Sequence, residues 1–317
     1  MLTRRDFIAH AVGMTAAATP AYSGLGASAP TQIAQETGAG LRTFLDGTLV
    51  DRARVTEWER RRISVAAARL STNYTGLLRG EVDSLIGRYK ISVDDIAIAR
   101  AALTQARAMI GLDGLRDLVA AEIFASELGT RAALAASGGQ WAISTAEIVS
   151  DSGCASGFVE WLTRAKDTDD RAVWTDACPD HYIIATCPEG RQEVVEVTGG
   201  AILASRFFID YSETESVVVP TDRAYPLTIA GTAVLASGEL IGRGCHQFRD
   251  EPVGGFRAQL KIAFPAAVPS LYISEHQWHL ACEFSNWITA YLRGSIRKRN
   301  CLWPADPAPF RRHTDIE

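Results

Sequence analysis

The sequence lacks the patterns that most often reveal a function. It contains no Gly-rich phosphate loop, no GxGxxG after a strand, no GxSxG nucleophile elbow and no HExxH motif. No run of about 18 consecutive apolar residues follows residue 30, so we expect no membrane span beyond that point. These absences disfavour the common nucleotide-dependent and hydrolase classes, and no motif indicates a particular cofactor.

A surplus of positive charge is also missing. The 317 residues carry a formal net charge of -5, so the chain has no general attraction for phosphate backbones and we expect no nucleic-acid partner. Hydrophobic residues make up 47% and charged residues 22% of the chain, which is typical of a folded globular protein. The length allows one large domain or two modest ones.

The N-terminal residues carry a pattern that the rest of the chain does not. Arg4 and Arg5 are followed by Phe7, a weakly apolar stretch, and a small-residue segment ending at Ala29 in an A-x-A arrangement. This resembles a twin-arginine export signal, whose arginines are read by a receptor. The resemblance implies a signal over 1–29, the twin-arginine translocase as a partner, and a periplasmic or extracellular location.

A second resemblance leaves a cytoplasmic location open. Some actinobacterial helix-turn-helix regulators carry a similar RRxF segment internally, and residues 41–139 resemble the helical region that follows it in those proteins. On that interpretation the protein is derived from a regulator and stays in the cytoplasm.

Residues 30–40 are typical of a linker, and residues 41–139 have helical periodicity. Apolar residues recur at spacings of three and four, as at Ile63, Ala66 and Leu70. This pattern predicts four or five helices packed as an N-terminal bundle.

From Trp141 onward the pattern changes, so we place a boundary between Ser137 and Trp141. Turn signals and alternating apolar residues predict two hairpins, further strands and two helices. The expected strands are 181–187, 191–197, 205–211, 227–235, 240–248 and 256–264, and the expected helices are 158–166 and 274–292. Residues 140–295 should therefore form an α+β domain, an antiparallel β-meander packed on a C-terminal helix, followed by a tail at 296–317.

The strongest candidate site lies on the predicted C-terminal helix. His276, His279 and Glu283 fall at i, i+3 and i+7, on one helix face. Imidazoles and a carboxylate on one face suit a metal site or acid/base chemistry, and Cys282 and His246 could complete it. The alternative is a core helix whose histidines are simply hydrogen-bonded.

Two further candidates come from the strands. Arg249 lies near a strand end, where it could line a pocket mouth or pair with the carboxylates that follow it. Glu193 and Glu196 fall on opposite faces of their strand. We expect Glu193 to bind a ligand or to pair with Arg206.

The cysteine count is even, which permits three disulfides in an exported protein. A protein that folds in the reducing cytoplasm before export need not form them, so we expect free and mostly buried thiols. The six residues are Cys154, Cys178, Cys187, Cys245, Cys282 and Cys301.

These observations favour an exported protein that binds a small molecule or a protein partner through its C-terminal domain. The alternatives are an enzyme, metal-dependent or acid/base, with a His/Glu site in that domain, and a regulator-derived cytoplasmic protein. The sequence specifies no substrate and no cofactor.

Replacing Arg4 and Arg5 together with lysine should leave the protein in the cytoplasm, because the export receptor reads the arginine pair. Immunoblotting of cell fractions measures this. Unchanged export of the double variant would show that the routing prediction is wrong.

Overall fold

The computed structural model describes residues 40–91, 95–212 and 219–297. All of them belong to one compact unit, Thr37–Glu317, which contains both of the predicted halves. The predicted signal, most of the predicted linker and most of the predicted tail lie outside the described residues. None of the described helices combines the length and apolar character that a membrane crossing requires.

A single antiparallel sheet of nine strands dominates the described part of the chain, in the order β2-β1-β3-β9-β8-β7-β6-β5-β4. Together with the helices, it confirms the α+β class. The strands are β1 (Leu41–Leu45), β2 (Thr48–Val50), β3 (Trp141–Ser150), β4 (His181–Thr186), β5 (Gln192–Glu196), β6 (Ser205–Asp210), β7 (Leu227–Val234), β8 (Leu240–Asp250) and β9 (Phe256–Pro265).

The C-terminal strands follow the sequence prediction closely. The β4–β5 and β7–β8 hairpins form as expected, and β9 alternates along its length. Phe256, Ala258 and Leu260 are fully buried on one face, while Arg257 on the other face pairs with Glu251. This alternation is that of an antiparallel strand with one face on a core.

The first two strands correct the prediction of helix from residue 41. Asp46 and Gly47 both adopt positive φ, 47° and 75°, which is the requirement of a type I′ hairpin turn. The Asp-Gly pair is the sequence signal for that turn. Since β1 also pairs with β3, the N-terminal half contributes two strands to the sheet.

Four helices follow this hairpin: α2 (Arg52–Asn73), α3 (Arg79–Ile91), α4 (Ile96–Leu118) and α5 (Ala120–Ser137). They do not form the self-contained bundle that the sequence predicted. Ile63, Leu70 and Leu103 share one buried cluster with Tyr182 of β4 and Val195 of β5. Helices α2 and α4 therefore bury apolar side chains against the sheet as well as against each other, because the sheet presents apolar side chains of its own on that side.

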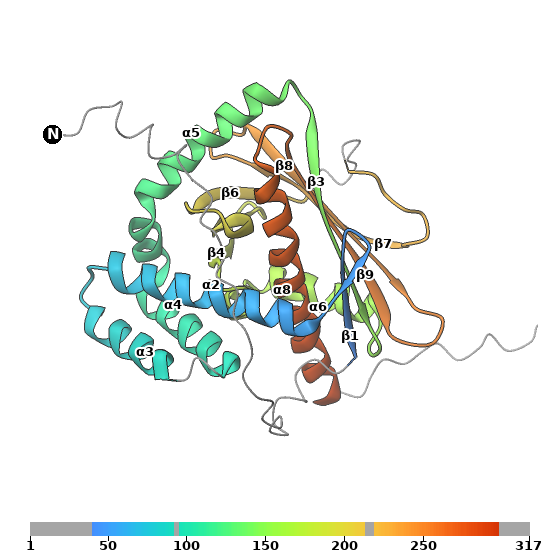
Figure 1. Cartoon of the computed structure of the whole chain (residues 1–317), viewed down its shortest axis with the longest axis horizontal. Helices are drawn as coiled ribbons and strands as arrows, with labels where there is room; N and C mark the ends of the chain where they lie inside the picture. Colours follow the sequence, from blue (N-terminus) through green and yellow to red (C-terminus); the bar gives the residue numbers. More distant parts are fainter. Residues whose placement is uncertain (1–39, 92–94, 213–218, 298–317) are drawn as a thin grey trace, which may run out of the picture. The chain divides into compact units, whose positions relative to one another are not determined.

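The remaining helices are α6 (Ala155–Asp167), α7 (Arg171–Ala177) and α8 (Ser270–Arg297), with a short 3-10 turn, η2 (Thr198–Gly200). The helix α8 runs through the middle of the structure and contacts β3, η2, α2 and α7 (Figure 1). The Phe158 ring of α6 packs between Phe256 of β9 and Phe284 of α8, with centroid distances of 5.4 and 6.4 Å. This packing fixes α8 against the sheet.

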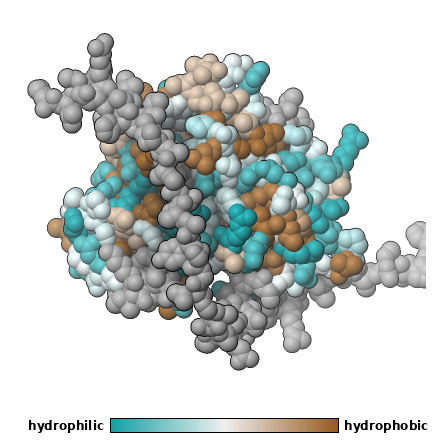
Figure 2. Space-filling model, viewed as in Figure 1, coloured by the Kyte–Doolittle hydropathy of each residue, from teal (hydrophilic) through white to brown (hydrophobic). Residues whose placement is uncertain are grey.

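The described surface seen in Figure 2 is a mixture of hydrophilic residues and smaller hydrophobic areas. Such a mixture is ordinary for folded proteins. The unusual polar groups of this protein lie in its interior, next to α8.

Candidate functional site: a buried histidine and carboxylate cluster

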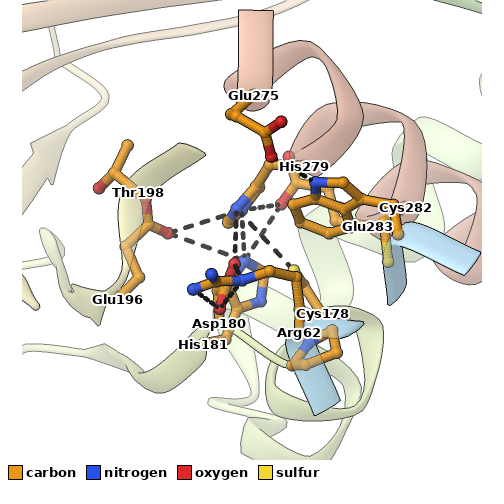
Figure 3. Close-up of polar contacts among 12 residues, drawn as sticks. Arg62, Cys178, Asp180, His181, Glu196, Thr198, Glu275, His279, Cys282 and Glu283 are labelled. Carbon is orange, nitrogen blue, oxygen red and sulfur yellow. Dashed lines mark hydrogen bonds and ion pairs between the residues drawn. The ribbon is translucent and has the colours of Figure 1, made fainter. Parts of the chain in front are cut away.

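Two histidines and two glutamates from three elements meet in the interior (Figure 3). His181 begins β4, Glu196 ends β5, and His279 and Glu283 lie one turn apart on α8. The side chains are 1%, 9%, 2% and 10% exposed, in that order. Four ionisable groups at this burial need either mutual compensation or a bound ion.

The backbone brings these residues together in two ways. His181 and Glu196 are direct partners in the β4–β5 ladder, so neighbouring strands place them side by side. Gly199 follows in η2 with φ of +58°, and a Cβ there would lie 2.9 Å from the Tyr272 carbonyl oxygen and from the His276 Cβ. Because glycine has no Cβ, η2 can approach α8 closely and hold the end of β5 next to the helix.

Four side-chain atoms of the cluster surround one small space. His181 Nε2 lies 3.1 Å from His279 Nε2, 3.3 Å from Glu283 Oε2 and 3.7 Å from Glu196 Oε2. His279 Nε2 lies 3.7 Å from Glu283 Oε2 and 3.9 Å from Glu196 Oε2. Ligand atoms in a tetrahedral zinc site are separated by about 3.3–3.6 Å, given bonds of about 2.0–2.2 Å. The arrangement therefore suits a metal ion.

The other ring nitrogens have their own contacts. His181 Nδ1 lies 2.9 Å from the Trp174 carbonyl oxygen, to which it can donate. His279 Nδ1 lies 3.9 Å from Asp180 Oδ2 and 3.9 Å from Cys178 Sγ. A proton on His181 Nδ1, donated to the Trp174 carbonyl oxygen, leaves the Nε2 lone pair of that ring available, which is the usual arrangement of metal-binding histidines.

Asp180, behind His279, is itself held by an arginine of α2. Arg62 Nε lies 2.9 and 2.8 Å from the two Asp180 carboxylate oxygens, and Arg62 Nη2 lies 2.7 Å from Oδ1. Burial raises the pKa of Asp180, and the charge of Arg62 opposes that rise. This bidentate pair orients the carboxylate that faces His279.

Burial changes the protonation of the cluster itself. It raises the pKa of Glu196 to about 7 and also raises the pKa of Glu283, although His181 opposes both rises. Burial lowers the pKa of His279 well below its ordinary value, and His181 adds to this. Burial alone would lower the pKa of His181, but Glu283 and Glu196 raise it. A divalent cation would balance two carboxylates and leave both imidazoles neutral.

The predicted face of α8 is buried, and two of its three predicted residues belong to the cluster. The third, His276, stacks on His279 with a centroid distance of 5.4 Å, and its Nδ1 lies 3.1 Å from Ser144 Oγ. Burial lowers its pKa to about 3, with His246 and His181 contributing. His276 therefore supports the cluster from outside as a neutral ring.

His246 lies on the same side of the sheet, in contact with α8. Its ring meets Phe284 edge-on with a centroid distance of 4.9 Å. Burial lowers its pKa to about 4, and its Nδ1 has no hydrogen-bond partner among the described residues. His246 is thus near the cluster without completing it.

Arg249 and Glu193, the two strand residues expected to bind a ligand, are not part of the cluster. Arg249 follows Phe248, which faces α8, so it points to the opposite face of β8. There it lies 4.9 Å from the Tyr225 ring centroid and 3.4 Å from Glu251. Arg249 therefore pairs with a carboxylate that follows it in the chain, which is one of the two alternatives expected from the sequence.

Glu193 also forms ion pairs. Its Oε1 lies 3.0 Å from Arg116 Nε and 2.6 Å from Arg206 Nε. The expected pairing with Arg206 is confirmed, and both partners lower the pKa of Glu193 against the effect of burial. Of the two glutamates on opposite faces of β5, Glu196 is the one that enters the cluster.

Sequence reasoning missed His181, Glu196 and Asp180. No local spacing connects them to α8, since the contacts span about a hundred positions. The one available signal was the run Cys178-Pro179-Asp180-His181 at the start of a predicted strand, which places three potential ligands or supporting groups within four residues.

Cys178, Cys187, Cys245 and Cys282 are free thiols, as expected, and Cys178, Cys245 and Cys282 are buried. Cys301 lies outside the described residues. Cys178, His181 and His279 each place one potential ligand atom within 4.8 Å of the others. Cys282 Sγ lies 3.8 Å from the Ala177 carbonyl oxygen and 3.6 Å from Asn286 Nδ2.

Comparison with known proteins adds little to this description. No family model matches the chain, and no curated protein matches it. One solved structure, described as protein Ms6760 from Mycobacterium smegmatis, is similar at 14% identity. The match covers 49% of this chain and 92% of that chain, with a TM-score of 0.29.

Replacing Arg62 with methionine should destabilise the protein by about 3–5 kcal/mol, because it leaves the buried Asp180 carboxylate without its partner. Chemical denaturation at neutral pH measures the loss. The matched control is Arg42→Met, which breaks an ion pair with Asp151 whose members are 53% and 57% exposed. That change should cost less than about 1 kcal/mol. Equal losses in the two variants would contradict the structural role of the Arg62–Asp180 pair.

Proposed function

We propose that the protein binds one divalent transition-metal ion through His181, His279, Glu196 and Glu283. The observation that carries the proposal is the set of five Nε2 and Oε2 separations, all between 3.1 and 3.9 Å. Two imidazole nitrogens and two carboxylate oxygens suit Zn²⁺, Fe²⁺, Co²⁺ or Mn²⁺. This proposal replaces the weaker metal set of His276, His279 and Glu283.

The charges of the cluster support the same proposal. Without an ion, the two buried carboxylates need protons on themselves or on His181, and burial raises the pKa values of Glu196 and Glu283. A bound divalent ion would allow both carboxylates to stay ionised. The hydrogen bond from His181 Nδ1 to the Trp174 carbonyl oxygen would orient that histidine before the ion arrives.

Acid/base catalysis by the same residues is a second candidate. It is favoured by Glu196, whose pKa of about 7 lies where a general acid or base works best at neutral pH. In that case Glu196 and His181 would exchange protons with a substrate. Metal analysis of the purified chain separates the two candidates.

The export proposal is compatible with a buried centre. The twin-arginine route carries folded proteins, and a four-residue site in the core would be loaded while the chain folds. The ligand-binding role that the sequence favoured is thus proposed as metal binding in an exported protein, with a cytoplasmic location as the alternative.

The metal proposal predicts one ion per chain when protein stripped by a chelator is titrated with Zn²⁺ or Mn²⁺ in a calorimeter. Replacing His279 or Glu283 with glutamine should weaken binding more than about 100-fold, because a ligand is lost.

The matched control is His276→Gln, which alters a buried imidazole on the same face of α8 that is not a ligand. This variant should keep the affinity within a few-fold of the wild type. A loss in His276→Gln as large as in His279→Gln would refute the proposed ligand set. Absence of stoichiometric binding in the wild type would refute metal binding altogether.

A further inference from the structure

His246 of β8 is a polar side chain on the sheet face that meets α8, and the metal proposal does not use it. Its ring contacts Phe284 edge-on, and its Nδ1 forms no hydrogen bond with a described residue. Its Nε2 lies 3.9 Å from the position that a Cβ would occupy on Gly244, two residues earlier on the same face of the strand. The imidazole therefore borders a part of the sheet that carries no side chain.

The fold itself does not require glycine at position 244. The backbone of Gly244 does not have a positive φ, so any residue could adopt its conformation. A Cβ there would have only two close neighbours among the described side chains, Ile262 Cδ1 at 3.1 Å and His246 Nε2 at 3.9 Å. A small movement of the flexible Ile262 side chain would make room for it. Glycine inside a strand often marks a place that a ligand approaches closely.

The side chains around Gly244 face the core but are only half-buried. Ile229 and Ile262 are the ladder partners of His246 and Gly244, and both border the core cluster that includes α8. All four residues keep part of their surface accessible, whereas Phe248 on the same face is fully buried. The helices therefore cover the sheet completely at Phe248 and incompletely around Gly244.

We infer that the sheet face formed by Gly244, His246, Ile229 and Ile262 binds a small, planar, uncharged molecule that carries a hydroxyl group, such as a phenol. The missing side chain at Gly244 leaves a flat surface for a ring, and the two isoleucines supply apolar contact. A hydroxyl can donate or accept a hydrogen bond, so it can pair with His246 Nε2 in either tautomer. This inference goes beyond the metal proposal, because none of the four residues is a proposed metal ligand.

The surroundings favour an uncharged ligand. Three of the four residues are apolar, and burial lowers the pKa of His246 to about 4, so its ring is neutral at pH 7. The nearest α8 groups are Phe284 and His276, whose pKa is lowered to about 3. A carboxylate or ammonium group on the ligand would lose its hydration here without gaining an oppositely charged partner.

The test uses the full-length protein, stripped of metal by a chelator, and two probes of nearly equal shape, phenol and toluene. Calorimetric titration at pH 7 should show one site for phenol, with a dissociation constant of about 0.1–1 mM. Toluene should bind about 2–10-fold more weakly, because its methyl group cannot hydrogen-bond to His246.

Two variants test the two parts of the site. His246→Phe should remove the preference for phenol over toluene, since the ring remains and the nitrogens are lost. Gly244→Val should abolish the binding of both probes by filling the flat surface, and Gly244→Ala should weaken it. The control is Thr228→Val, which changes an exposed side chain of β7 and should leave both affinities unchanged. Thermal unfolding monitored by circular dichroism shows that each variant is folded.

Three results would overturn the inference. The first is a wild-type protein that binds neither probe, and the second is phenol binding that persists undiminished in folded Gly244→Val and Gly244→Ala. The third is a preference for phenol that survives in His246→Phe. Because these titrations contain no metal, they leave the proposed metal site untested, and titration of the same protein with Zn²⁺ tests it separately.

Discussion

Two carboxylates and two imidazoles share one buried space between β4, β5 and α8, and their charges must be compensated there. Burial raises the pKa of Glu196 to about 7 and lowers the pKa of His279, whereas Glu283 and Glu196 raise the pKa of His181. A divalent cation removes the conflict, because it neutralises the carboxylates and binds neutral imidazoles. The same space without an ion would require protons on the carboxyl groups or on His181.

Apolar packing, rather than the polar contacts themselves, holds the elements that carry these four side chains in position. The ring of Phe158 on α6 packs against Phe256 of β9 and Phe284 of α8. This packing sets the position of α8 against the sheet. Gly199 allows η2 to touch α8, and Arg62 of α2 forms an ion pair with Asp180, the residue next to His181. Helix α2, in the half predicted to be separate, therefore supplies part of the support for the site.

The sequence predicted the α+β class, most C-terminal strands and the C-terminal helix, since each of these follows from local periodicity. His279 and Glu283 could be placed on one face by their spacing alone. The positions of their partners, His181 and Glu196, could not be predicted in this way, because strand pairing and the close contact of Gly199 with α8 bring these two residues to the helix. Alternation put Glu193 and Glu196 on opposite faces but gave no sign of which face meets α8. The β1–β2 hairpin was overlooked although Asp46-Gly47 is its usual turn.

The most direct test of the metal centre is a crystal structure of protein loaded with zinc, with diffraction data collected on both sides of the zinc absorption edge. The account predicts one strong anomalous peak, about 2.0–2.2 Å from His181 Nε2, His279 Nε2 and at least one carboxylate oxygen of Glu283 or Glu196. An anomalous map with no peak between β4, β5 and α8, or with zinc bound at the surface instead, would contradict it.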